Sequence, residues 1–180
     1  MNILALLLAA TLYHAEPVNG TVGFTVMKWG VMKEEGTFRE FNAEILLDEK
    51  DASKSRVTFD VNVASIDTKN DTRDDTLRSP DFFHVEKHPK MTFRSTRIVP
   101  RGKTAADVTG DLTIRGVTKR VTVPVKLIGV SPDRKRAGFE TEFTIDRRQF
   151  GVNGSRWSQH APGVLGTEVT IRIVTGGVVR

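Results

Sequence analysis

Residues 57–63 read VTFDVNV, in which Val57, Phe59, Val61 and Val63 are apolar and the three residues between them are polar. Successive side chains of a β-strand point to opposite faces, so this run predicts a strand with one apolar face and one solvated face. Seven other stretches of the chain alternate in the same way, and almost none of it has helical periodicity. Eight such strands predict an all-β sheet that closes into a barrel with its apolar faces inside.

The connections between the expected strands are short, which favours an antiparallel up-and-down order. In the second strand the facing of the apolar side chains changes near Arg39 and Glu40, and this change predicts a β-bulge. Tight turns are expected at Arg115-Gly116 and at Pro132-Asp133. The expected strands are residues 21–28, 36–47 and 56–64, and then strands marked by Met91 and Phe93, by Ala106 to Ile114, by Val117 to Leu127, by Phe139 to Ile145 and by Val169 to Ile173.

One polar stretch interrupts the strands and predicts the only helix. Residues 65–77 are rich in residues that start helices, so a short helix is expected near residues 67–79. Asp67 or Asn70 would cap its N-terminus, and it would end before Pro80. Phe82 and Phe83 follow directly, and we expect them to pack this segment onto the barrel.

The composition limits the classes of function. The chain has 180 residues, which suits one domain, and it has no cysteine, which excludes disulfides, thiolate zinc sites and cysteine nucleophiles. A net charge of +5 favours anionic partners, but the basic residues are dispersed along the chain. Nucleic-acid binding is not expected, because most of the Phe residues fall on the apolar side of their strands and are not available for base stacking.

The first residues have the features of a leader. The chain is apolar from Ile3 to Leu12, a run too short to span a bilayer but as long as the core of a signal peptide. We expect a leader over residues 1–12 and a barrel domain over residues 13–180, although a first buried strand is the alternative. A leader predicts a periplasmic or secreted protein, and its absence predicts a cytoplasmic one.

Motifs for metal binding or catalysis are weak. His84 and His88 are four residues apart, but the intervening glutamate is one position away from the zinc-protease pattern and Pro89 follows at once. The chain has no nucleophile elbow, phosphate loop or dinucleotide fingerprint. We therefore assign no catalytic residue and no metal ligand.

The inward side chains allow two interpretations. A solid core and a cavity for a long apolar molecule both need apolar residues at the inward positions, and the alternation cannot separate them. The five inward phenylalanines are Phe24, Phe59, Phe93, Phe139 and Phe143.

Several linked motifs resemble one known family. Residues 70–83, NDTRDDTLRSPDFF, resemble the central signature of the YceI-like proteins, a bacterial polyisoprenoid-binding, lipocalin-like family. The resemblance covers roughly Tyr13 to Val174 in the order of the family. Flanking segments that agree with it are residues 22–26, 36–41, 65–68, 110–119 and 145–151.

The resemblance implies an eight-stranded antiparallel barrel whose elongated apolar pocket binds a polyprenyl chain, without catalysis and without a catalytic cofactor. The ligand would be an isoprenoid quinone or a polyprenyl phosphate, stored or transported in the barrel. Many relatives are exported to the periplasm, which favours the leader. The expected ligand contacts are Val22, Phe24, Val26, Phe59, Val61, Phe93, Leu112, Phe139, Phe143 and Ile145.

The head group of such a lipid would lie at the mouth of the barrel. The cations that could bind an anionic head are Arg73, Arg78, Lys119 and Arg147, and the sequence does not choose among them. Besides the lipid, we expect a transient contact with a membrane surface, and the sequence leaves open whether the protein is a homodimer. The alternative functions are an enzyme that acts on an apolar substrate at the barrel mouth, or a basic module that binds anionic surfaces.

Overall fold

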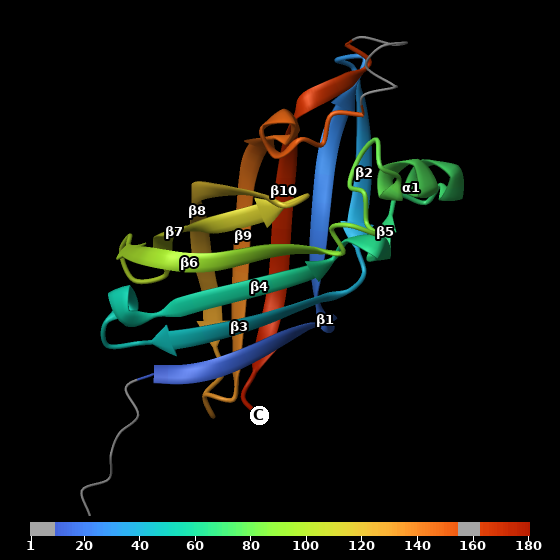
Figure 1. Cartoon of the computed structure of the whole chain (residues 1–180). Coiled ribbons are helices and arrows are strands. Elements are labelled where there is room, and N and C mark those ends of the chain that lie inside the picture. Colours follow the sequence, from blue (N-terminus) through green and yellow to red (C-terminus); the bar gives the residue numbers. More distant parts are fainter. Residues whose placement is uncertain (1–9, 155–162) are drawn as a thin grey trace, which may run out of the picture.

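Eight strands are hydrogen-bonded into a closed antiparallel ring (Figure 1). The computed structural model describes residues 10–154 and 163–180. Strand β10 pairs with β1 and closes the sheet, so the predicted eight-stranded barrel is confirmed. The ring consists, in order, of β1 (Ala10–Lys28), β3 (Phe41–Asp48), β4 (Arg56–Asn62), β6 (Lys90–Pro100), β7 (Ala105–Ile114), β8 (Val117–Val130), β9 (Arg136–Asp146) and β10 (Leu165–Val178).

Strand β1 is much longer than the sequence indicates. Its second half, which was predicted, pairs with β2 (Met32–Phe38), while its first half pairs with β3. The register of β1 against β10 shifts between Ala15 and Gly20. This irregularity interrupts the alternation of apolar and polar residues, so the first half of β1 is not recognisable as a strand from the sequence. Residues 10–12, placed in the expected leader, lie in β1 opposite residues 46–48; residues 1–9 lie outside the described residues.

The expected second strand is two strands. The prediction of one strand with a bulge was wrong, because the chain breaks between β2 and β3 at Arg39 and Glu40, where the bulge was expected. The break lets β2 and β3 pair with different halves of β1. In a single regular strand Phe38 and Phe41 would point to opposite faces. Because they lie on separate strands, both are buried.

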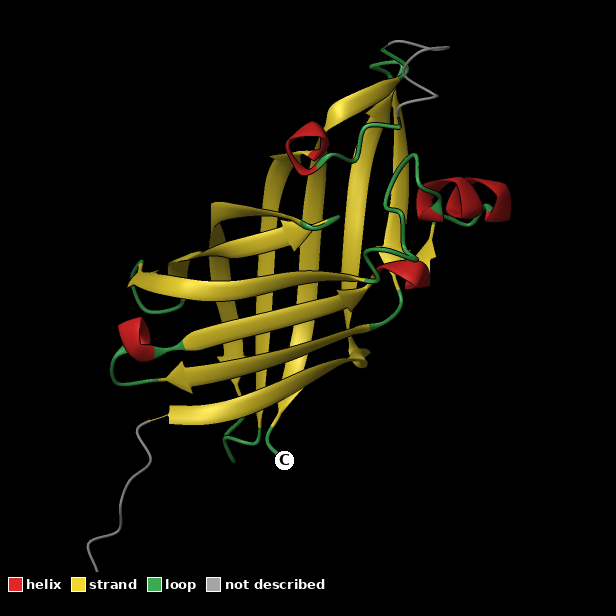
Figure 2. Ribbon diagram, in the orientation of Figure 1, coloured by secondary structure: helices red, strands yellow, loops and turns green. Residues whose placement is uncertain are grey.

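The predicted helix forms outside the barrel, beside β2 and the short strand β5 (Ile66–Asp67), as Figures 1 and 2 show. Helix α1 covers Asp71–Arg78, and its cap is Asn70, whose side chain accepts a hydrogen bond from the Arg73 backbone N–H at 3.0 Å. Buried Asp74 accepts hydrogen bonds from the backbone N–H and the hydroxyl of Thr68, which tie the helix to the segment after β5. The described residues also form three 3₁₀ helices: Ala52–Lys54, Val63–Ser65 and Arg147–Phe150.

The remaining local predictions concern a turn and two phenylalanines. Arg115 and Gly116 form the tight hairpin turn, with φ angles of 49° and 74°. Phe82 is 5% exposed and packs with the apolar side chains of β7, and Phe83 packs beside it, as predicted for the join between helix and barrel. Among the described residues, no helix is both long and apolar enough to cross a lipid bilayer.

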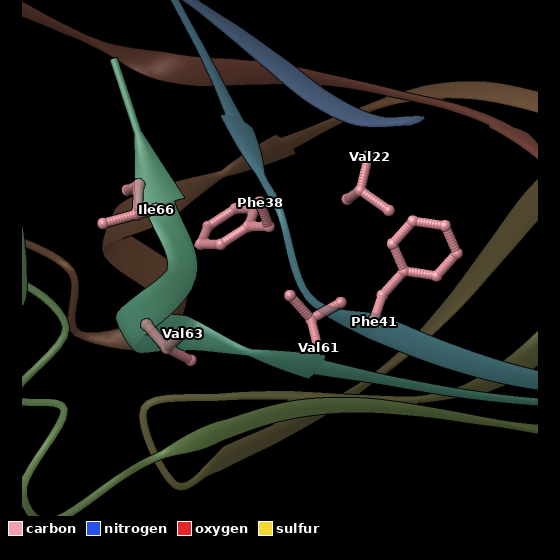
Figure 3. Close-up of a cluster of buried hydrophobic side chains, with 6 residues drawn as sticks. All are labelled: Val22, Phe38, Phe41, Val61, Val63 and Ile66. Atoms are coloured by element: carbon pink, nitrogen blue, oxygen red, sulfur yellow. The ribbon is translucent and has the colours of Figure 1, made fainter. Parts of the chain in front are cut away.

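Buried side chains gather where β1, β2, β3 and β4 meet. Figure 3 shows this cluster, with the Phe41 side chain near that of Val22. The ring of Phe41 also stacks on Phe59, with centroids 5.4 Å apart. Aromatic stacking of this kind adds to the stabilisation from burial and fixes the orientation of both rings. The cluster consists of Val22, Phe38, Phe41, Val61, Val63 and Ile66.

Candidate ligand-binding site

A cavity of about 210 Å³ lies inside the barrel. Every strand of the closed ring contributes to its wall, from Val22 on β1 to Ile173 on β10. The sequence left a solid core and a cavity as equal alternatives, and the structure has the cavity. Because the lining side chains are almost all apolar, the cavity suits a ligand whose binding is driven by removal of apolar surface from water.

All of the inward residues selected from the sequence line this cavity. The alternation placed them correctly because side-chain direction in a strand depends only on local parity. That they contact a ligand stays a prediction. They are Val22, Phe24, Val26, Phe59, Val61, Phe93, Leu112, Phe139, Phe143 and Ile145.

A further part of the wall was not predicted from the sequence. Strand β10 was recognised, and its alternation at Val169, Ile171 and Ile173 could have placed these residues in the cavity. Ile45 on β3 and Val123 and Val125 on β8 also line the cavity from within predicted strands, and their alternation could have placed them there too. Many of the remaining missed residues lie on the helix, in loops or at strand ends, where no period shows the direction of a side chain. These are chiefly Leu77, Phe82, Phe83, Met91, Phe150, Val152 and Leu165.

Arg147 is the one proposed head-group cation that lines the cavity. Its guanidinium is half-buried and donates from Nε to the Gly166 carbonyl at 2.8 Å, from Nη1 to the Val152 carbonyl at 2.6 Å and from Nη2 to the Leu165 carbonyl at 3.1 Å. No described carboxylate forms an ion pair with it, since the neighbouring Asp146 pairs with Arg148 at 2.6 Å. Burial lowers the pKa of Arg147 from its ordinary value.

The other three cations lie elsewhere. Arg73 donates to both oxygens of Thr68 and forms an ion pair with Glu34. Arg78 donates to the carbonyls of Ala64 and Ile66, and so holds the helix against the chain that precedes it. Lys119 is exposed on β8 opposite Leu112 and does not line the cavity. Arg147 is therefore the cation of this set that is placed to meet a ligand in the cavity.

Thr175 supplies a second polar position in the apolar wall. Its side chain is 4% exposed, and its hydroxyl has no hydrogen-bond partner among the described residues. Thr175 and Leu165, whose carbonyl binds Arg147, lie at opposite ends of the β10 lining. These positions are ten residues apart, which corresponds to about 33 Å of strand at roughly 3.3 Å per residue. The lining therefore extends along most of β10, with Arg147 at one end and Thr175 near the other.

Few ionisable groups face this cavity. Among the described lining residues only Glu140 and Arg147 are ionisable, and Glu140 forms an ion pair with Lys126 at 3.1 Å. The two histidines considered for a metal, His84 and His88, lie in the loop before β6 with ring centroids 6.0 Å apart. Within the part of the chain that the structure describes, no three His, Asp or Glu side chains are grouped so that they could hold a metal ion.

Comparison of the sequence finds relatives over most of the chain. A family model described as the YceI-like domain matches residues 13–176. "Protein YceI" of Escherichia coli O6:H1 is 41% identical over 134 residues, which are 73% of this chain and 70% of that protein. A "UPF0312 protein" of Pseudomonas aeruginosa is 40% identical over the same length and with the same coverage.

Comparison of the structure finds the same barrel in solved proteins. BcnA of Burkholderia cenocepacia superposes with a TM-score of 0.82 at 27% identity, over 90% of this chain and 98% of that one. A domain from Saccharophagus degradans, described as polyisoprenoid-binding and implicated in plant cell wall breakdown, gives a TM-score of 0.76 over 94% of this chain and all of its own. At 15% identity, this second likeness is one of fold.

Proposed function

Because the chain belongs to the YceI-like family, we propose that its cavity binds the polyprenyl chain of an isoprenoid lipid, for storage or transport and without catalysis. One observation carries the proposal: a long, almost wholly apolar lining to which all eight strands of the barrel contribute. The Saccharophagus degradans domain, described as polyisoprenoid-binding, shares this fold. The proposed contacts are the ten inward residues named above, together with Val169, Ile171 and Ile173 of β10.

The binding energy would come from the hydrophobic effect. Removing roughly 400 Å² of apolar ligand surface from water is worth about 10 kcal/mol, at about 25 cal/mol per Å². This is comparable to the cost of about 4–15 kcal/mol for the motional freedom lost on association. A short isoprenoid would therefore bind weakly, and each further unit that fits in the cavity would add affinity.

The proposed orientation places the head group of the lipid beside Arg147. This guanidinium forms no direct ion pair with a described carboxylate, and its position at one end of the lining leaves the rest of the wall to the hydrocarbon chain. Polyprenyl phosphates and isoprenoid quinones both offer oxygen acceptors to such a cation. The few ionisable groups in the lining favour binding over acid–base catalysis.

The proposal is tested with polyprenols and polyprenyl phosphates of increasing chain length, titrated into the protein in a constant low concentration of detergent. The dissociation constant should fall with each added isoprene unit until the cavity is filled, and should then stay constant. An affinity that does not depend on chain length would contradict binding of the chain in the barrel.

A further inference from the structure

The turn between β1 and β2 exposes three large apolar side chains close together. Trp29 is 56% exposed, Val31 is 79% exposed and Met32 is 48% exposed. Lys28 precedes them and Lys33 follows them. We call these six residues, 28–33, the hairpin tip. Apolar groups gathered at a projecting point and flanked by cations are typical of a surface that contacts another phase or molecule.

The backbone of the hairpin tip favours a residue other than tryptophan. Trp29 and Gly30 have φ angles of 53° and 71°, and the Val31 N–H donates to the Lys28 carbonyl at 3.2 Å. Such a turn, with two left-handed residues, prefers Asn-Gly, because an asparagine tolerates positive φ far better than a bulky side chain does. Strain held on an exposed turn points to a use for the indole ring, since more than half of the residue is exposed to solvent.

The hairpin tip projects from the end of the barrel at which Arg147 lies. The Trp29 N–H donates to the Val164 carbonyl at 2.7 Å, and Lys28 pairs with Leu165 across the sheet. Leu165 lines the cavity, and its carbonyl accepts a hydrogen bond from Arg147. Figure 1 shows the β1–β2 turn beside the start of β10 at the top of the barrel.

The charges around the hairpin tip favour an anionic surface. The Lys28 ammonium lies 4.4 Å from the centroid of the Trp29 ring and 3.6 Å from a Glu34 oxygen. Glu34 also pairs with Arg73 of helix α1, and Glu35 is the other carboxylate on β2. Lys33, on the other side of the turn, forms no ion pair with a described carboxylate.

We propose that the hairpin tip docks on the surface of a lipid bilayer that contains anionic phospholipid. Tryptophan is the side chain most suited to the interface between head groups and hydrocarbon, because its ring is apolar and its N–H is polar. Val31 and Met32 would enter beside it, while Lys28 and Lys33 would bind the anionic head groups. Docking in this way would bring the Arg147 end of the cavity to the lipid from which a ligand is taken.

The substitution Trp29→Asn separates the role of the ring from the role of the turn. Asn-Gly suits this backbone, so the variant should fold and have an unchanged or raised Tm. The matched control is Ile128→Asn, because Ile128 is 55% exposed on β8 and packs against Gly138, whose partner on β10 is Gly176, far from the hairpin tip.

The measurement is co-sedimentation with vesicles of phosphatidylcholine that contain about one third phosphatidylglycerol. The unchanged protein and Ile128→Asn should bind, and Trp29→Asn should bind about tenfold more weakly, a loss of roughly 1.4 kcal/mol. Equal binding by Trp29→Asn, or no binding by the unchanged protein, would overturn the proposal. So would a dimer that Trp29→Asn dissociates, seen by analytical ultracentrifugation, because the tip would then contact a second copy.

Docking goes beyond the proposed isoprenoid binding and is tested separately from it. Trp29→Asn should retain the affinity for a polyprenyl phosphate that is supplied in detergent without vesicles. Vesicle binding without isoprenoid binding would contradict the proposed function and leave the docking intact. Isoprenoid binding together with equal vesicle binding by the unchanged protein and by Trp29→Asn would contradict the docking and leave the proposed function intact.

Discussion

The ring of Phe24 on β1 lies against Gly36, its cross-strand partner on β2. A Cβ at Gly36 would overlap this ring and would also come within 2.8 Å of the Thr68 side chain. The missing side chain therefore gives Phe24 its position in the cavity wall. A similar contact occurs across β6 and β7, where the ring of Phe93 lies against Gly110, whose cross-strand partner is Ser95.

Gly36→Ala should push the Phe24 ring into the cavity. Forcing one extra carbon into a packed site costs about 1–3 kcal/mol, and the displaced ring should also weaken isoprenoid binding. Urea denaturation and a ligand titration on the same protein measure both effects. The control is Gly129→Ala, since a Cβ there meets no atom within 4 Å. Unchanged affinity in a folded Gly36→Ala protein would show that Phe24 does not shape the site.

Val169→Phe should fill the cavity from β10. The residue is half-buried in the lining, and a larger side chain there occupies space that is otherwise free, so the Tm should stay the same or rise. Affinity for a long polyprenyl phosphate should fall at least about tenfold, a loss of roughly 1.4 kcal/mol. Glu168→Phe adds the same ring at the exposed neighbouring position and should bind normally. A Val169→Phe protein that binds as well as its control would exclude this part of the wall.

Arg147→Gln should affect two properties. The substitution removes the guanidinium and with it the hydrogen bonds to three carbonyls. Because a hydrogen bond from a charged donor is worth about 1.5–3 kcal/mol, the variant should be less stable by at least about 2 kcal/mol. Where the variant is folded, affinity for a polyprenyl phosphate should fall more than affinity for the uncharged polyprenol. Arg148→Gln removes an exposed cation next to Arg147. This control should change neither the stability nor the relative affinity for the two ligands. An equal loss for both ligands would mean that Arg147 supports the wall and does not bind the head group.

Lowering the pH should remove the contribution of the Asp67 carboxylate to the stability of the fold. The Lys69 backbone N–H, the Lys69 ammonium and the Arg39 guanidinium hold the pKa of this carboxyl well below its usual range. A carboxyl whose pKa is lower in the folded state stabilises the fold above its unfolded pKa of about 3.9, and this contribution is lost as the pH falls toward the folded pKa. The Tm of Asp67→Asn should thus lie below that of the unchanged protein at pH 6, and the difference should shrink between about pH 4 and pH 2. A difference that is constant with pH would contradict this assignment.

The parts of the site that the sequence predicts are those that local geometry determines. Phe59 and Phe143 could be placed in the lining because parity along a strand fixes the direction of a side chain. The first half of β1, which lies outside the lining, could not be recognised as a strand, because the register shifts between Ala15 and Gly20. Leu77 could not be placed in the lining, because it reaches the cavity from a helix outside the barrel.

Two other features depend on contacts between distant residues. The choice of Arg147 among four cations rests on the carbonyls of Leu165 and Gly166, which approach it only when β9 and β10 pair. The cavity itself depends on how completely the inward side chains fill the barrel. A full barrel and a hollow one have the same alternation, so only the three-dimensional structure separates them.

Native mass spectrometry of the protein purified from its own host, followed by extraction and identification of any bound lipid, is the sharpest test of lipid binding inside the barrel. We expect a complex whose added mass is that of one polyprenyl lipid, and we expect Val169→Phe, prepared in the same way, to lack it. A protein that is free of lipid in both forms, or a bound molecule without an isoprenoid chain, would rule out isoprenoid binding in this cavity.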